Sequence, residues 1–317
     1  MFNLHNKKIV FIAGLAVTLL VTFVSGAILY KNRNHPSPFE KRVFQALSFT
    51  NLPFMEGQPF FFPAITETDK KNQTGENKAE VILEEASSMK KSKSDDWWLN
   101  SGGVMISDGK KFSPNIGALG ENSPWHKLYS KTNSRDTDGG YFPQNIFRLV
   151  TRGKWKNFSQ SVYFNIDKIN LSESEYRNES NGVLLFNRYR DGDNLYYTGL
   201  RVDGYAVIKK KIKGKYYTLA EKNLFAKEKK YDREDMPNLI PVNAWMGLKS
   251  EVENIGDNAV NIKVYIDQAQ NGNWQLVLEK QDKGDKYGKK PLLKAGYAGI
   301  RTDFMDVEFE NYSIQGL

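Results

Sequence analysis

The sequence predicts an all-β protein whose strands form two stacked antiparallel sheets. One observation is the stretch 181–215, where apolar or alternating segments are separated by tight-turn residues such as Asp191-Gly192. A second observation is the alternation of apolar and polar residues in 260–267 and 305–310, which is typical of strands with one buried face. The composition agrees, because 13% of the residues are aromatic and aromatic residues favour strands. An antiparallel sandwich buries such half-apolar strands.

The segment 1–33 predicts a membrane anchor or a signal peptide. Residues 9–30 carry no charge over a length that can cross a bilayer core as one helix. Ser25-Gly26-Ala27 also fits the small-residue site of a cleaved signal, so both alternatives stay open. A charged start, an apolar run and small residues follow in the order of an export signal. We therefore expect a single-pass protein with an extracytoplasmic C-terminal domain, or a secreted one if the segment is cleaved.

Residues 34–96 differ in character from the rest of the chain. A short helix is expected in 36–47, and the apolar stretch 54–63 is either an early strand or a patch that packs on the main domain. Residues 66–96 are charged and poor in large apolar side chains, so we expect a linker that is partly disordered. The main domain is expected to cover 97–317.

Within 97–317, turn sequences rich in glycine, aspartate and asparagine separate the expected strands. These strands are 103–106, 146–151, 158–167, 182–189, 195–202, 205–213, 216–220, 244–253, 260–267, 274–280, 295–301 and 305–314. The stretch around His126 is expected to be a loop. A lone histidine there is more often a surface or packing residue than a metal ligand.

Composition narrows the function classes. The chain has no cysteine, which excludes disulfides, cysteine-based zinc sites and a thiol nucleophile. The formal net charge of +8 favours anionic partners, although a lysine-rich solvated surface is the simpler explanation. The basic clusters 209–215 and 283–294 come without a nucleic-acid-binding motif, and the sequence has no phosphate-binding glycine motif. We therefore expect neither a nucleotide nor a nucleic-acid partner.

Two parts of the chain resemble one known superfamily. The segment 298–302 (AGIRT), followed by 306–314 (DVEFENYSI), looks like the closing strands of concanavalin A-like, or laminin G-like, jelly rolls. The segment 183–201, which contains NRYRDGDNLYYTGLR, is similar to their central hairpin. The ending is also close to that of the 3-keto-disaccharide hydrolase-like group. The resemblance covers 97–317 and implies a jelly-roll sandwich, but no single activity, since the superfamily holds lectins, glycosidases, lyases and adhesion modules.

Two patterns resemble catalytic strands of this superfamily. Three acids alternate within 306–310, as in laminarinase-type glucanases, but in the wrong order, and a solvent-facing acidic row explains them more simply. Arg148 and Arg152 have the arginine spacing of jelly-roll alginate lyases without the residues between them. A lyase here would use a tyrosine such as Tyr197 as its base. Whether the protein is an enzyme stays open, as a glycoside hydrolase or a polysaccharide lyase.

Jelly rolls bind sugars through aromatic rings that stack on sugar faces and planar polar groups that hold hydroxyls or carboxylates. Side chains of these types, on strand faces expected to point outward, are the ligand-binding candidates. They are Arg148, Arg152, Tyr163, Asn187, Tyr197, Arg201 and Trp245. Core packing is the alternative for the aromatic candidates.

Two aspartate-rich turns have side chains that can supply oxygen ligands to calcium, although both are also ordinary turn sequences. Their aspartates are Asp136, Asp138, Asp191 and Asp193. No other cofactor is expected.

The leading expectation is a membrane-tethered carbohydrate-binding module that recognises a polysaccharide, with an anionic polymer as one option. The first alternative is a glycoside hydrolase or polysaccharide lyase on the same scaffold. The second alternative is a protein-binding adhesion or structural domain, which would present an exposed apolar patch.

Overall fold

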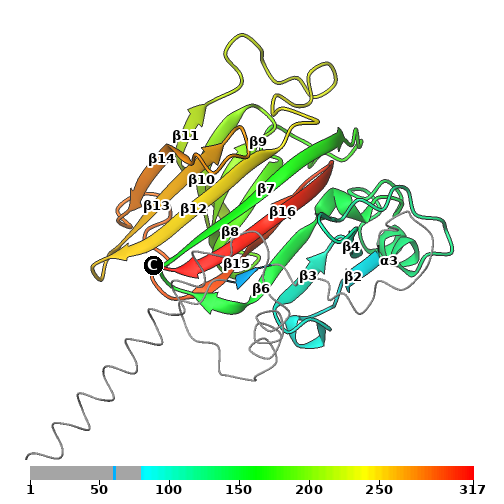
Figure 1. The fold of residues 1–317 in the computed structure, drawn as a ribbon, viewed down its shortest axis with the longest axis horizontal. Coiled ribbons are helices and arrows are strands. Elements are labelled where there is room, and N and C mark those ends of the chain that lie inside the picture. Colours follow the sequence, from blue (N-terminus) through cyan, green and yellow to red (C-terminus); the bar gives the residue numbers. More distant parts are fainter. Residues whose placement is uncertain (1–59, 62–79) are drawn as a thin grey trace, which may run out of the picture. The chain divides into compact units, whose positions relative to one another are not determined.

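Two antiparallel sheets stack face to face (Figure 1). This computed structural model describes residues 60–61 and 80–317, which belong to one compact unit. The prediction of an all-β sandwich is confirmed. Most expected strands appear within a few residues of their predicted ends.

The first sheet has nine strands in the described part of the chain, and β1 pairs with β16 beside the main path. The path is β14 (Gln275–Asp282), β13 (Ala259–Asp267), β12 (Met246–Ile255), β7 (Phe158–Ile169), β16 (Met305–Gly316), β5 (Phe112–Ser113), β4 (Val104–Ser107) and β2 (Glu80–Glu84), with β1 at Phe60–Phe61.

The second sheet has seven strands among the described residues. Its order is β11 (Lys215–Asn223), β10 (Tyr205–Ile212), β9 (Asn194–Arg201), β8 (Gly182–Asp191), β15 (Gly296–Thr302), β6 (Arg148–Trp155) and β3 (Trp97–Ser101). Every pair of neighbouring strands is antiparallel.

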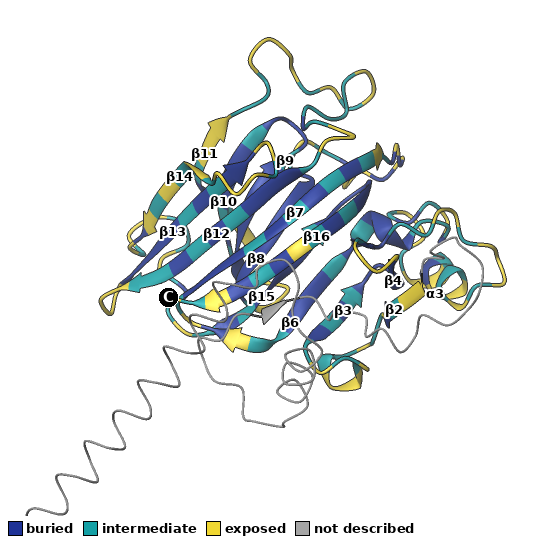
Figure 2. Cartoon of the chain, in the orientation of Figure 1, coloured by how far each residue is buried: buried dark blue, intermediate teal, exposed yellow. Residues whose placement is uncertain are grey.

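The main core lies between the sheets, as the dark-blue strand segments of Figure 2 show. The alternation in 305–310 places Val307 and Phe309 in this core, with at most 1% of either residue exposed. Aromatic contacts join the two layers: the rings of Trp97 on β3 and Tyr312 on β16 are 4.9 Å apart. Such edge-to-face packing adds to the burial of apolar area.

Two segments differ from expectation. The linker predicted over 66–96 is wrong for 80–96, because the apolar residues 81–83 allow β2 to form and pair with β4. The loop predicted around His126 is helix α3 (Pro124–Thr132). Ser123 caps this helix by accepting a hydrogen bond from the Trp125 N–H at 3.2 Å, and proline occupies the first turn. Serine followed by proline is a helix start signal that strand periodicity does not reveal.

The predicted membrane segment and the short helix in 36–47 lie outside the described residues. In the ranges 60–61 and 80–317, no helix combines the length and the apolar character needed to cross a membrane. The early strand expected within 54–63 is confirmed for Phe60–Phe61, which pair with β16.

Three consecutive lysines on β10 have different surroundings. Lys209 and Lys211 lie on the outer face of the seven-stranded sheet, whereas Lys210 points between the sheets and is fully buried. The Lys210 ammonium lies 2.7 Å from the Asp282 carboxylate at the end of β14 and 2.8 Å from the Lys289 carbonyl. This buried ion pair joins the two sheets at one edge.

Candidate functional site

A groove of about 610 Å³ opens on the outer face of the seven-stranded sheet. Strand alternation explains its floor: Leu184, Phe186 and Tyr197 point outward from β8 and β9, while their neighbours along each strand point into the main core. These outward side chains form a second apolar cluster. Cavities of this volume with an apolar floor are typical of small-molecule and oligosaccharide sites.

Two glycines contribute to the shape of this face. Gly199 on β9 lies opposite Leu184, and Gly299 on β15 lies opposite Phe186. A Cβ atom at Gly299 would lie 2.1 Å from the Leu149 carbonyl oxygen, so no larger residue fits without moving a neighbouring strand. Because neither glycine has a side chain, the floor of the groove is recessed between the aromatic rings.

The centre of the groove holds two tyrosines and one arginine. The Arg301 guanidinium donates a hydrogen bond to the Tyr197 hydroxyl at 3.3 Å, and the rings of Tyr197 and Tyr216 stack with centroids 6.0 Å apart. The Arg301 charge is matched by Asp303, whose carboxylate lies 2.8 Å away. The Lys211 ammonium lies 4.7 Å from the centroid of the Tyr216 ring. Aromatic faces and planar donors therefore converge in one place.

The two phenols differ in acidity. Burial raises the pKa of the Tyr197 hydroxyl to about 12. Burial would also raise the pKa of Tyr216, but the charges of Arg301 and Lys211 and the hydrogen bond with Tyr197 outweigh burial and lower the pKa. Tyr216 is the more acidic of the two groups, and about half of its surface is exposed.

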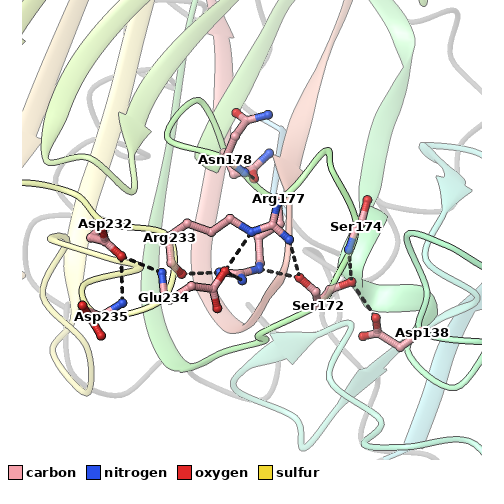
Figure 3. A network of polar contacts seen from close by, with 10 residues as sticks. Asp138, Ser172, Ser174, Arg177, Asn178, Asp232, Arg233, Glu234 and Asp235 are labelled. Carbon is pink, nitrogen blue, oxygen red and sulfur yellow. Dashed lines mark hydrogen bonds and ion pairs between the residues drawn. The ribbon is translucent and has the colours of Figure 1, made fainter.

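One wall of the groove comes from the loop between β7 and β8, which carries Tyr176 with 59% of its surface exposed. The neighbouring Arg177 is buried and anchors this loop (Figure 3). Its guanidinium donates to the carbonyls of Ser172 and Arg233, each at 2.6 Å. It also lies 3.0 Å from the Glu234 carboxylate, which ties the wall to the 232–235 turn.

The aspartates of the first turn brace the same loop. The Ser172 hydroxyl donates to Asp138 at 2.5 Å (Figure 3), and the Ser174 hydroxyl donates to Asp136 at 2.5 Å. Asp138 also accepts a hydrogen bond from the Asn145 amide. These carboxylates therefore already act as hydrogen-bond acceptors that fix the wall.

The second turn uses its aspartates in the same way. Asp191 accepts the backbone N–H of Asp193 at 2.8 Å, and Asp193 lies 3.5 Å from the Lys211 ammonium. In the described ranges, no three or more histidine or acidic side chains are grouped so that they could hold a metal ion. Calcium binding at these four aspartates stays a prediction.

Two of the sequence-predicted ligand residues, Arg148 and Tyr197, line the groove. Arg201 lies on the same strand as Tyr197 but forms ion pairs with Asp203 and Glu221. Arg152 does not share the groove with Arg148, because the pairing of β6 with β15 shifts register between them.

After this shift, the Arg152 guanidinium donates to the Ser94 carbonyl at 2.5 Å and lies 3.7 Å from Asp95. Arg152 therefore holds the chain segment before β3.

The other three candidates lie elsewhere. Tyr163 belongs to β7 in the nine-stranded sheet, where its hydroxyl donates to Asp267 at 2.9 Å. Trp245 precedes β12 of that sheet and has the Lys111 ammonium 5.6 Å from its ring centroid. Asn187 was expected to face outward and instead is fully buried between the sheets.

The Asn187 amide accepts hydrogen bonds from Gln160 and Ser250 and donates one to Thr198, each at 2.9 Å. The expectation was wrong because 182–189 has apolar residues on both faces, so its sequence does not show which face is inner.

The acidic row of the last strand is also satisfied within the protein. Asp306 is buried and accepts a hydrogen bond from the Asn170 amide at 3.0 Å. Glu308 lies 2.9 Å from the Lys111 ammonium, and Glu310 accepts a hydrogen bond from Gln270 at 3.1 Å. None of these three acids lines the groove.

Reasoning from the sequence missed most of the groove residues, among them Tyr176, Lys209, Tyr216 and Arg301. Lys209 and Tyr216 could have been found by continuing the outward face of Tyr197 across the next two strands. Arg301 occupies an outward position of the strand 295–301, which was predicted correctly. Tyr176 lies in a loop and gives no periodic signal.

No model of a known protein family matches the sequence, and no curated protein matches it. Solved structures do show similarity. The carbohydrate-binding module CBM66 from Bacillus subtilis is 17% identical, over 54% of this chain and 82% of that chain, with a TM-score of 0.37. The exoplasmic/lumenal domain of VIP36 in its Ca2+/Man-bound form is 10% identical, over 77% and 91%, with a TM-score of 0.39.

A mutant of the GH43 protein BlXynB from Bacillus licheniformis is 11% identical over 68% of this chain, with a TM-score of 0.37. This chain spans 33% of that protein's length. At such identities the likeness concerns the fold alone.

Proposed function

We propose that the groove binds a polysaccharide. The observation that carries the proposal is the combination of an apolar aromatic floor with two exposed tyrosines, Tyr216 from β11 and Tyr176 from the loop before β8. Exposed aromatic rings beside a groove are suited to stacking on the CH faces of sugars. Hydroxyl and guanidinium groups next to these rings can hold sugar hydroxyls.

The proposal is tested by screening the purified full-length chain on a polysaccharide array. We expect saturable binding that falls about tenfold when Tyr176→Ala or Tyr216→Ala removes a stacking ring. Both residues are exposed, so their replacement should leave the fold intact. Leu276→Ala is the matched control, since Leu276 is 48% exposed on β14 of the other sheet.

Two results would overturn the proposal. One is an array without any bound glycan, which would favour a protein-binding role. The other is glycan binding that both tyrosine variants retain in full, because the ligand would then bind outside the groove.

One observation favours polysaccharide lyase activity as a second candidate function. A lyase needs a base that removes the proton from C5 of a uronate, after which the C4–O bond breaks and a C4=C5 double bond forms. The lowered pKa of Tyr216, beside Arg301, suits such a base better than Tyr197, whose pKa of about 12 keeps its proton bound. Wild-type protein incubated with polyuronates should then produce the ultraviolet absorbance of the unsaturated product, and Tyr216→Phe should not.

A glycoside hydrolase is less well supported by the same groove. Inverting and retaining enzymes both need two carboxyl groups that flank the scissile bond. Among the described residues that line the groove, the carboxylates are Asp136 and Asp303. Asp303 is held by Arg301 and Asp136 by Ser174, so neither is free to act on a sugar.

The proposed setting of this module is the outer side of a membrane, with 9–30 as the tether. The support is the uncharged apolar run and its order relative to the charged start. Membranes from expressing cells should keep the full-length protein after alkaline extraction, and external protease should digest 80–317. A full-length protein found in the soluble fraction would contradict the tether.

A further inference from the structure

The groove contains more positive than negative charge, and part of the positive charge has no partner. Its basic side chains are Arg148, Lys209, Lys211 and Arg301. Arg301 is paired with Asp303 at 2.8 Å, and Lys211 with Asp193 at 3.5 Å. Among the described residues, the side chains of Arg148 and Lys209 form no hydrogen bond and no ion pair; the acidic groups that act on them, Glu85 on Arg148 and Asp203 on Lys209, lie beyond ion-pair distance.

Lys209 lies beside the aromatic centre of the groove. It is paired across the strands with Tyr197, and it is only partly exposed. Burial and the nearby Arg201 charge lower the pKa of the Lys209 ammonium, and they outweigh Asp203 and Tyr216, which act in the opposite direction. A partly desolvated cation with no ion-pair partner in contact gains more from an incoming anion than an exposed lysine does.

Arg148 lies at the other side of the same floor. Arg148 on β6 is the cross-strand neighbour of Arg301 on β15, so two guanidinium groups lie on adjacent strands. The Asp303 carboxylate neutralises the charge of Arg301. The planar guanidinium of Arg148 presents donors in the geometry that suits a carboxylate or another oxyanion.

Strand order sets the spacing between these two cations. Arg148 is on β6 and Lys209 on β10, with β15, β8 and β9 between them. Four interstrand steps of about 4.8 Å put their backbones ~19 Å apart along a flat sheet. A ligand that contacts both side chains therefore spans the width of the groove, which suits a chain that runs across the strands better than a single sugar ring.

We propose that Arg148 and Lys209 bind oxyanion groups of an acidic polysaccharide that lies across β6, β15, β8, β9 and β10. This inference rests on the proposed function of the groove and adds the substrate class. The acidic groups are carboxylates or sulfate esters, and the sugar rings between them lie over Phe186 and Tyr197. The partnered cations, Lys211 and Arg301, hold the aromatic rings in place.

The test compares acidic and neutral forms of the same polymers on the full-length chain. The probes are polygalacturonate against its methyl ester, and dextran sulfate against dextran. We expect at least one acidic form to bind about tenfold or more tightly than its neutral counterpart, as for one charge-assisted hydrogen bond. The preference should shrink with added salt. The two acidic arms distinguish carboxylate from sulfate.

Variants separate the inference from the proposed function. Lys209→Met and Arg148→Met should each weaken binding of the acidic form more than binding of the neutral form, so that the preference for the acidic form shrinks. Lys215→Met is the matched control, because Lys215 is exposed at the β10–β11 turn outside the groove lining. Acidic oligomers should compete much better than the free acidic monosaccharide.

The inference is overturned if acidic and neutral forms bind equally, or if the Lys209→Met/Arg148→Met double variant keeps the preference. It is also overturned if Lys215→Met weakens acidic binding as much as Lys209→Met, since that indicates general surface attraction. The proposed function fails on different results: the wild-type protein binds no glycan at all, or Tyr176→Ala and Tyr216→Ala leave glycan binding unchanged.

Discussion

The buried ion pair between the sheets allows a quantitative test of the packing. Both side chains of the Lys210–Asp282 pair are at most 1% exposed, with their charged atoms 2.7 Å apart. Asp282 also accepts hydrogen bonds from the Tyr196 hydroxyl at 2.7 Å and from the Gly284 N–H at 3.1 Å. Asp282→Ala would remove all of these contacts and leave the Lys210 ammonium buried with the Lys289 carbonyl as its remaining acceptor.

Removing one partner of a buried pair costs about 3–5 kcal/mol, because the other charge stays in a poorly solvated site. This is a large part of the ~5–15 kcal/mol by which most domains are stable. The free energy of unfolding, measured by urea denaturation with tryptophan fluorescence, should therefore fall by about that amount in Asp282→Ala.

The double variant Lys210→Met/Asp282→Leu supplies the control. Replacing both charges by apolar side chains of similar size is often neutral or stabilising, so the double variant should regain most of the stability lost in Asp282→Ala. The reasoning is refuted if Asp282→Ala loses less than ~1 kcal/mol, or if the double variant is as unstable as the single one.

Three further predictions concern the groove and its supports. Arg177→Met should weaken glycan binding and lower the thermal midpoint, because the loop that carries Tyr176 loses its anchor; unchanged binding would contradict this role for the loop. Gly299→Ala should cost about 1–3 kcal/mol in urea denaturation through the collision with the Leu149 carbonyl, and a neutral result would disprove the tight fit. The pKa of Tyr197 is about 12 in the fold, above that of an unfolded tyrosine, so its contribution to stability should be full below pH ~10 and lost as pH rises to about 12; denaturation across this range should show the decline, which Tyr197→Phe should reduce.

Much of the fold follows from periodicity. The stretches 260–267 and 305–310 alternate strictly, and their apolar residues lie in the core as predicted. Periodicity fails where a strand is buried on both faces. In β8 the polar Asn187 faces the interior while Phe186 faces the groove, and the sequence contains no signal that separates these two directions.

The site could be predicted only in part, because it depends on strand order and on register. Three adjacent lysines at 209–211 look like one solvated cluster, yet Lys210 finds a partner in Asp282, which lies 72 positions further along the sequence. Arg152 follows Arg148 by four positions, a spacing that places two side chains on the same face of a regular strand. The irregular pairing of β6 with β15 breaks this regularity, so the two arginines do not share the groove. Neither Asp282 nor this register shift can be recognised before the sheets are assembled.

The position of the last two strands has a consequence for how the protein is made. β15 separates β8 from β6 in one sheet, and β16 separates β7 from β5 in the other. These are the final strands of the described chain to leave the ribosome, so neither sheet can close until both have emerged. The nascent chain, whose closing contacts are far apart in sequence, therefore stays open during synthesis.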